Sequence, residues 1–183
     1  MAKEKKKVEK KAAGKTSAKK STTASSSGFV VKNGEQVIKY FTLVPALPVA
    51  GKRGNWKLTD SKGVVVDSLN VGFDENPSAL ERSFERAILV VRMPDPIDGA
   101  PGVWRFALGG VATDHGDENP YNDIAVEIID NGFTLLVYVQ ALENNEENAP
   151  FGFVASYTDS KTGAVSIYES VDPIIIVDRP PKP

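Results

Sequence analysis

Cysteine is absent from the 183-residue chain, and histidine occurs once, as His115. The absence of cysteine excludes disulfides, thiolate-bound zinc, iron–sulfur clusters and a cysteine nucleophile within this chain. Long apolar runs are also missing, since stretches such as 87–91 and 174–177 fall far short of the roughly 20 residues that a membrane-spanning helix needs. No apolar stretch follows the first lysines, so no secretory signal is predicted and we expect a cytoplasmic protein.

The formal net charge of −2 conceals two regions of opposite sign. Residues 1–28 contain nine lysines against Glu4 and Glu9, a local charge of +7, and the remaining 155 residues carry −9. Residues 1–28 have too few large apolar side chains to offset the entropy lost when a backbone is ordered. We therefore predict a disordered lysine-rich arm on an acidic body.

Such an arm can neutralise the phosphates of nucleic acid or the charges of another anionic polymer without reading a sequence. The same lysines could contact the acidic body of a neighbouring subunit, or the arm could only solubilise the chain. The lysines expected to make either contact are Lys5, Lys6, Lys7, Lys10, Lys11, Lys15, Lys19 and Lys20.

Short β-rich runs separated by turn-forming residues begin at Phe29. About ten strand candidates follow one another, a pattern typical of antiparallel sandwiches and barrels. Asn131-Gly132 is a strong hairpin signal, and the loops "TDSKG" and "TDSKTG", which start at residues 59 and 158, each place a glycine where a positive φ closes a turn. We therefore predict an all-β protein, a single antiparallel β-sandwich over residues 29–178, with a proline-rich end at 179–183.

One segment favours a helix. In "NPSALERSFERAI", which starts at residue 76, Ser78 and Glu81 have the spacing of a capping box. Pro77 suits the beginning of a helix, and four apolar residues would share one helical face: Leu80, Phe84, Ala87 and Ile88. We predict a short helix near residues 77–87 that leads into a strand.

The segment "TDHGDENPYND" at 113–123 concentrates carboxylates, amides and the only histidine. Calcium takes about six to eight oxygen ligands, and the candidates here are Asp114, Asp117, Asn119 and Asp123. The segment departs from an EF-hand because a glycine stands two residues after Asp114. Asp, Asn, Gly and Pro also make ordinary turns. His115 lacks the partner pattern of a catalytic base, and no cofactor other than this calcium is predicted.

Two aromatic pairs alternate along predicted strands, Trp104 with Phe106 and Phe151 with Phe153. Such pairs usually pack in a core, whereas an exposed pair would offer a stacking platform for a sugar. The segment "DPIIIV", which ends at Val177, resembles the terminal strand of bacterial inclusion-body proteins, which are β-sandwiches. The resemblance implies a closing strand of that fold and assigns no role to individual residues.

We predict a non-enzymatic structural or interaction protein. Its sandwich would pack with itself or with a partner in a homo-oligomer or larger assembly, while the arm contacts an anionic polymer or acidic neighbouring subunits. One alternative is a small carbohydrate-binding domain that uses the acidic segment with calcium and an exposed aromatic residue. Another is a hydrolase that uses two carboxylates.

Overall fold

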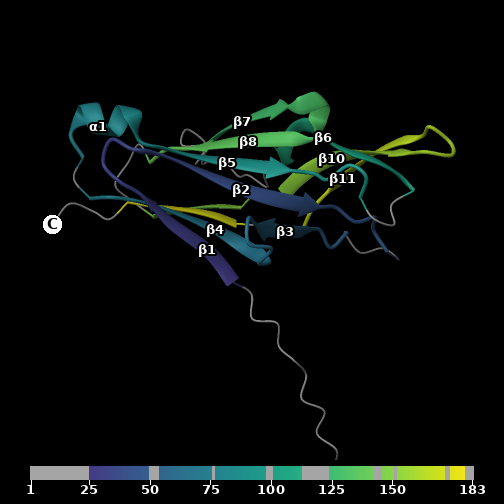
Figure 1. Cartoon of the computed structure of the whole chain (residues 1–183), viewed down its shortest axis with the longest axis horizontal. Helices are drawn as coiled ribbons and strands as arrows, with labels where there is room; N and C mark the ends of the chain where they lie inside the picture. Colours follow the sequence, from purple (N-terminus) through teal and green to yellow (C-terminus); the bar gives the residue numbers. More distant parts are fainter. Residues whose placement is uncertain are drawn as a thin grey trace, which may run out of the picture.

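The computed structural model describes residues 25–49, 54–75, 77–97, 101–112, 124–141, 146–150, 152–171 and 174–179. These residues form twelve β-strands in three sheets, with one short α-helix and a turn of 3₁₀-helix (Figure 1). The prediction of a mostly β protein with one short helix is confirmed. Within the same residues, no helix has the length and apolar character that crossing a bilayer requires.

Each sheet combines strands from distant parts of the sequence. The five-stranded sheet has the order β3 (Lys57–Asp60), β2 (Gln36–Val44), β5 (Arg86–Arg92), β8 (Thr134–Val139) and β7 (Ile124–Ile129). The four-stranded sheet has the order β1 (Ser25–Val31), β4 (Val66–Phe73), β12 (Ile174–Asp178) and β9 (Glu146–Pro150). The three-stranded sheet has the order β11 (Val165–Glu169), β10 (Gly152–Asp159) and β6 (Gly102–Ala112).

Among the nine strand pairs of the described residues, the predicted antiparallel pairing is confirmed for six and wrong for three, which are parallel. β4 runs parallel to both β1 and β12, and β2 runs parallel to β5. The cause is the path of the chain, which alternates between the four-stranded and five-stranded sheets from β1 to β2 and from β3 through β4 to β5. In these three pairs, the strand that returns to the sheet runs in the same direction as the strand that it joins.

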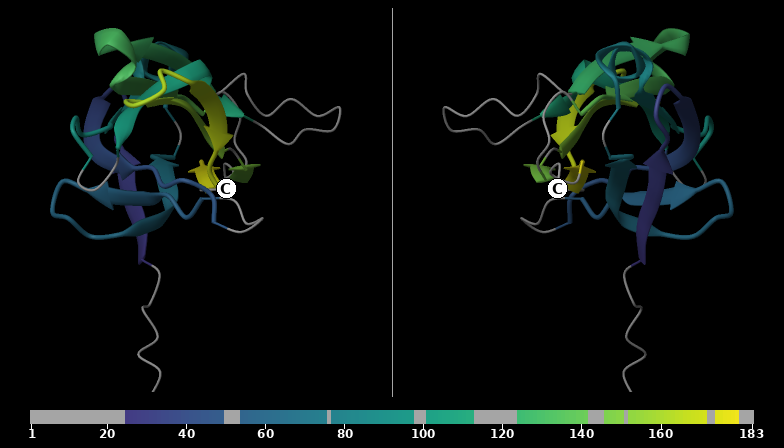
Figure 2. Two further views of the ribbon diagram at one scale, coloured as in Figure 1. Left: turned by 90° about the vertical axis from the view of Figure 1, so that its right-hand side faces the viewer. Right: turned by 90° about the vertical axis from the view of Figure 1, so that its left-hand side faces the viewer.

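One apolar core is shared by all three sheets. Leu69 and Ile175 contribute from the four-stranded sheet, Leu89 and Leu135 from the five-stranded sheet, and Phe153 from the three-stranded sheet. All five are at most 1% exposed. The end-on views show the strands curving around this common interior (Figure 2).

The boundaries of the folded body differ from the prediction at both ends. β1 begins at Ser25, so residues 25–28, which were assigned to the arm, belong to a strand. Arg179, which was assigned to the proline-rich end, is completely buried.

The hairpin predicted around Asn131-Gly132 is confirmed, because β7 and β8 pair antiparallel across the 3₁₀ turn η2 (Asp130–Gly132). The turn predicted at "TDSKTG" is also confirmed, because it joins the antiparallel pair β10 and β11. Asp159 Oδ1 closes its turn by accepting from the backbone N–H groups of Lys161 and Thr162 at 2.8 and 2.9 Å.

The first "TDSK" loop forms the same kind of turn, because Asp60 Oδ1 accepts from the backbone N–H groups of Lys62 and Val64, both at 2.9 Å. The strands on either side meet only at one bridge, between Thr59 and Val65. β4 then leaves for the four-stranded sheet, so the hairpin predicted at 55–71 is confirmed at its turn and wrong along its strands.

The helix α1 (Ala79–Phe84) begins with the predicted capping box, in which the Ser78 side chain accepts from the Glu81 backbone and the Glu81 carboxylate accepts from the Ser78 backbone. The predicted apolar face is not buried, since Leu80 is 69% and Phe84 55% exposed. The helix ends after six residues because Glu85 has an extended conformation (φ −64°, ψ 125°) and leads into β5.

Candidate interaction surface

The side of the five-stranded sheet that faces away from the core carries exposed apolar side chains. Side chains alternate between the two sides of a strand, and in β2 this alternation buries Phe41 and Leu43 in the core. Ile38 and Tyr40 therefore point outward, and they are 51% and 53% exposed. A strand of this kind has apolar residues on both sides, although only one side meets the core.

The strand register extends these side chains into two adjacent rows. Ile38 lies beside Ile88, which lies beside Tyr138, and Tyr40 lies beside Val90, which lies beside Leu136. Residues directly opposite on neighbouring strands have Cβ atoms about 4.5–5.5 Å apart, so each row is continuous. We call these six residues the outer face: Ile38, Tyr40, Ile88, Val90, Leu136 and Tyr138. Of these, Ile38 and Tyr40 are exposed, Ile88, Leu136 and Tyr138 are half-buried, and Val90 between them is only 7% exposed.

Charged groups border the outer face on two sides. The Arg92 guanidinium lies 6.0 Å from the centre of the Tyr40 ring. At the side of the outer face formed by β7, the Tyr138 hydroxyl donates to Glu127 Oε2 at 3.2 Å. Burial and this hydrogen bond raise the pKa of the Tyr138 phenol above its ordinary value of 10.0. The Tyr138 phenol is therefore neutral at physiological pH. The positive charge at the border is that of Arg92 on β5, and the negative charge is that of Glu127 on β7.

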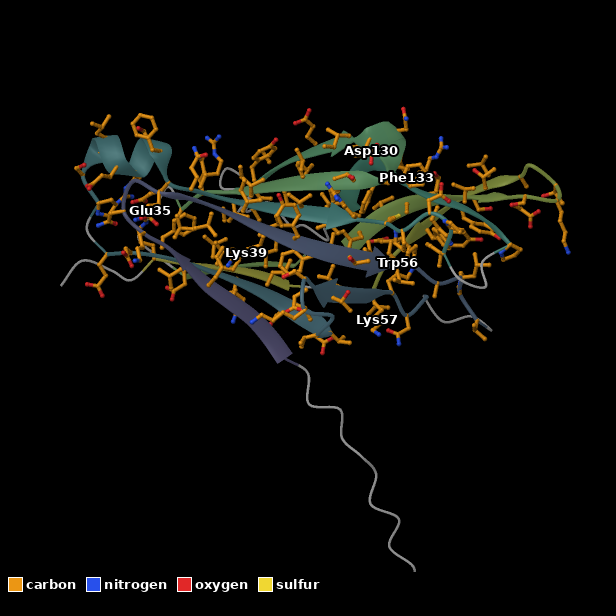
Figure 3. The ribbon with its side chains drawn as sticks, viewed as in Figure 1. Glu35, Lys39, Trp56, Lys57, Asp130 and Phe133 are labelled. Carbon is orange, nitrogen blue, oxygen red and sulfur yellow. The ribbon has the colours of Figure 1, made fainter. Side chains whose placement is uncertain are left out.

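Two further exposed apolar side chains lie on α1, which precedes β5. Phe84 is the last residue of α1, and Glu85, which follows it, is buried. Figure 3 shows α1 at one end of the sheet. Phe84 and Leu80 therefore add two exposed apolar side chains near one end of the sheet.

An aromatic cluster occupies another part of the protein but lies largely in the core. Trp104 packs against Trp56, Tyr157 and Tyr168 with ring centroids 5.0–5.6 Å apart. Trp104 and its predicted partner Phe106 are only 3% and 4% exposed. The prediction that this pair packs in the core is confirmed, and the pair offers no platform for a sugar.

Two hollows accompany these elements. A pocket of about 70 Å³ beside Trp56 and Phe153 is far smaller than the roughly 300–1,000 Å³ typical of ligand sites. A trough of about 420 Å³ crosses the outside of the four-stranded sheet, lined by Gly28, Asn70 and Gly72 among others. Its lining also includes Phe29, Val30, Ile176 and Asp178, but the apolar rows of the outer face are longer and more continuous, so we take the outer face as the candidate.

An ion pair is buried where α1 ends. Arg179 Nη2 donates to Glu85 Oε2, and both side chains are almost completely excluded from solvent. Arg179 Nη1 donates to the carbonyl oxygen of Asp74 at 2.9 Å, and Glu85 Oε1 accepts from the Gly34 N–H at 3.2 Å. These contacts join the ends of β12, β4 and α1 to the turn between β1 and β2, which indicates a structural role.

The residues predicted from the sequence to form sites lie outside the described residues. This holds for the eight lysines of the arm, for the calcium candidates Asp114, Asp117, Asn119 and Asp123, and for His115. In the parts of the chain that the structure does describe, no group of three or more His, Cys, Asp or Glu side chains is placed to hold a metal ion.

The outer face was missed by sequence reasoning, although a signal was present. β2 reads "QVIKYFTLV", in which the apolar residues Ile38 and Tyr40 occupy one side and Phe41 and Leu43 the other. A half-buried strand ordinarily alternates apolar and polar residues. Apolar residues on both sides of a strand are typical of a strand that packs against other elements on both sides, although in this chain one side of β2 is exposed.

The fold and this surface define a class: a β-sheet protein with mixed parallel and antiparallel sheets, one shared core and an exposed apolar sheet face. A family model, the DP-EP family, matches residues 25–179. The chain therefore belongs to the DP-EP family, and the match begins with the first residue of β1 and ends with the buried Arg179. A comparison with curated proteins gives no match.

Proposed function

We propose that this chain is a non-enzymatic interaction protein that associates with a second copy of itself through the outer face. The observation that carries the proposal is the pair of adjacent apolar rows on β2, β5 and β8, with Ile38 and Tyr40 about half exposed. Contiguous apolar patches on soluble proteins usually mark interaction sites. Packing two such faces together would form a sheet-on-sheet interface about 10 Å thick.

The charges at the border favour a second copy as the partner. In a twofold interface every contact occurs twice, because the symmetry repeats it with the two copies exchanged. Arg92 lies on β5 and Glu127 on β7, so a twofold rotation can bring each arginine toward the glutamate of the other copy. Complementary charges of this kind fix orientation and exclude wrong partners more than they add affinity.

Sedimentation velocity on the full-length protein tests this association. Tyr40→Lys introduces a charge into the middle of the outer face and is expected to remove the dimer formed through it. Val64→Lys is a matched control, because Val64 is 46% exposed but lies in the turn between β3 and β4. An unchanged sedimentation coefficient for a folded Tyr40→Lys variant would refute the proposal.

We also propose that the lysine-rich arm attaches the assembly to an anionic polymer. Its support is the segregation of charge, with +7 in residues 1–28 and −9 in the remainder. If the arm neutralises about six phosphates, its affinity for DNA should fall about a thousandfold between 50 and 200 mM salt.

The matched variant for this role replaces the eight arm lysines with glutamine in the full-length chain, which leaves β1 intact. We expect binding to a DNA duplex to be lost together with its salt dependence. Equal binding by the wild type and the glutamine variant would eliminate the attachment role and leave the outer face unaffected.

A further inference from the structure

β11 is an edge strand that protrudes from the body of the protein. Its five residues pair with β10, and in the described part of the chain no second strand lies beside it. The turn between β10 and β11 extends beyond the neighbouring strands at the right of Figure 1. Val165 and Ile167 are 63% and 49% exposed. Unpaired backbone groups and apolar side chains are thus presented together.

Proteins usually protect edge strands with charged residues, prolines or short strand lengths, and other edges of this fold show these devices. β9 contains two glutamates and Pro150, and β3 has only four residues, including Lys57 and Asp60. β7 has Glu127 near its centre. The edge strand β1, "SSSGFVV", shares with the first four residues of β11, "VSIY", the lack of a charge and of a proline, but its own first four residues have no large apolar side chain.

We propose that β11 pairs antiparallel with β11 of a second copy, about a twofold axis at Ile167. Two three-stranded sheets would then join into one continuous sheet of six strands. This register places the two Ile167 side chains opposite each other and Val165 opposite Glu169 of the second copy, so the two glutamates stay apart. Antiparallel pairing closes the assembly at two copies through this edge.

The charges near the ends of β11 fit this arrangement. The exposed Lys161 lies in the turn that precedes β11, and Glu169 is the last residue of the strand. In an antiparallel pair, the beginning of one β11 meets the end of the other. Val165 is opposite Glu169 in this register, so Lys161 lies four positions beyond that pair. Opposite charges therefore lie at the same end of the paired strands without a direct ion pair, and no like charges face each other, which suits a second copy as the partner.

A single cysteine provides a direct test, because the chain contains none. Directly opposite residues have Cβ atoms about 4.5–5.5 Å apart, so a small adjustment allows a disulfide. The full-length Ile167→Cys variant is expected to form a covalent dimer under mild oxidation, and Val64→Cys to remain monomeric on a non-reducing gel. Equal cross-linking of the two variants would overturn the proposal.

Sedimentation velocity separates this edge from the outer face, since the two surfaces involve different strands. Ile167→Lys places like charges opposite each other and is expected to remove only the association made through β11. Ile167→Lys and Tyr40→Lys should each yield smaller species than the wild type, and the double variant should be monomeric. An effect of Tyr40→Lys alone would overturn the β11 pairing, whereas an effect of Ile167→Lys alone would support it and refute the outer-face dimer.

Discussion

The buried pair of Arg179 and Glu85 allows a stringent test of the fold. Replacing Arg179 with methionine keeps much of the side-chain volume but removes the charge and the hydrogen bonds to Glu85 and Asp74. The contact of the guanidinium with the Phe73 ring, 5.1 Å from its centre, is also lost. The Glu85 carboxylate, which is 1% exposed, would stay buried and would keep the hydrogen bond from the Gly34 N–H.

Removing one partner of a buried ion pair typically costs about 3–5 kcal/mol, because the other charge is left uncompensated. We expect a loss of this size in the free energy of unfolding for Arg179→Met, a large part of the total of about 5–15 kcal/mol for a typical protein. Urea unfolding can be followed by the fluorescence of Trp56 and Trp104, whose environment lies in or beside the core. An m-value equal to that of the wild type would show that the variant exposes the same amount of surface when it unfolds.

The double variant Glu85→Leu with Arg179→Met controls for loss of packing. Replacing both charges with apolar groups removes the uncompensated carboxylate, so the double variant should be more stable than Arg179→Met alone. A loss below about 1 kcal/mol for Arg179→Met, or a double variant as unstable as the sum of its single variants, would refute the argument that the pair acts as a unit.

Three further predictions concern local features. Ser78→Ala removes the helix cap and should lower the free energy of unfolding by about 1 kcal/mol in urea titrations, whereas Ser78→Asp should retain most of it. Backbone N–H groups of Thr162 and Lys161 lower the pKa of Asp159 below 3.8. The stabilising contribution of the carboxylate is therefore present above that pH and lost as the pH falls through the folded-state pKa. In a plot of melting temperature against pH, Asp159→Asn should flatten this acidic part of the curve. Gly102→Ala would place a Cβ atom 2.2 Å from the Thr158 carbonyl oxygen and should lower the melting temperature markedly.

The features predicted correctly from the sequence are local ones. The Asn131-Gly132 turn and the capping box of Ser78 and Glu81 depend on residues within a few positions of each other, and both are present in the structure. The parallel alignment of β4 with β12 joins strands about a hundred residues apart. Turn and periodicity signals contain no information about such pairings, because they depend on how the whole chain returns to a sheet.

The candidate surface shows the same limit. The sequence reasoning located sites in charged segments, because charged clusters are conspicuous in a sequence. The outer face depends instead on three strands lying side by side, with Ile38, Ile88 and Tyr138 in one row. Only the register reveals that these separate apolar residues form one surface, and the exposed Leu80 shows that an apolar helical pattern need not indicate burial.

The position of β12 has a consequence for synthesis of the protein on the ribosome. β12 lies inside the four-stranded sheet, between β4 and β9, although it is the last of the described strands in the sequence. A nascent chain whose residues 174–178 are still in the exit tunnel has no neighbour for β9 and leaves one side of β4 open. Folding of this sheet must therefore wait until residues 174–178 have left the exit tunnel, and until then a chaperone would find both strand edges accessible.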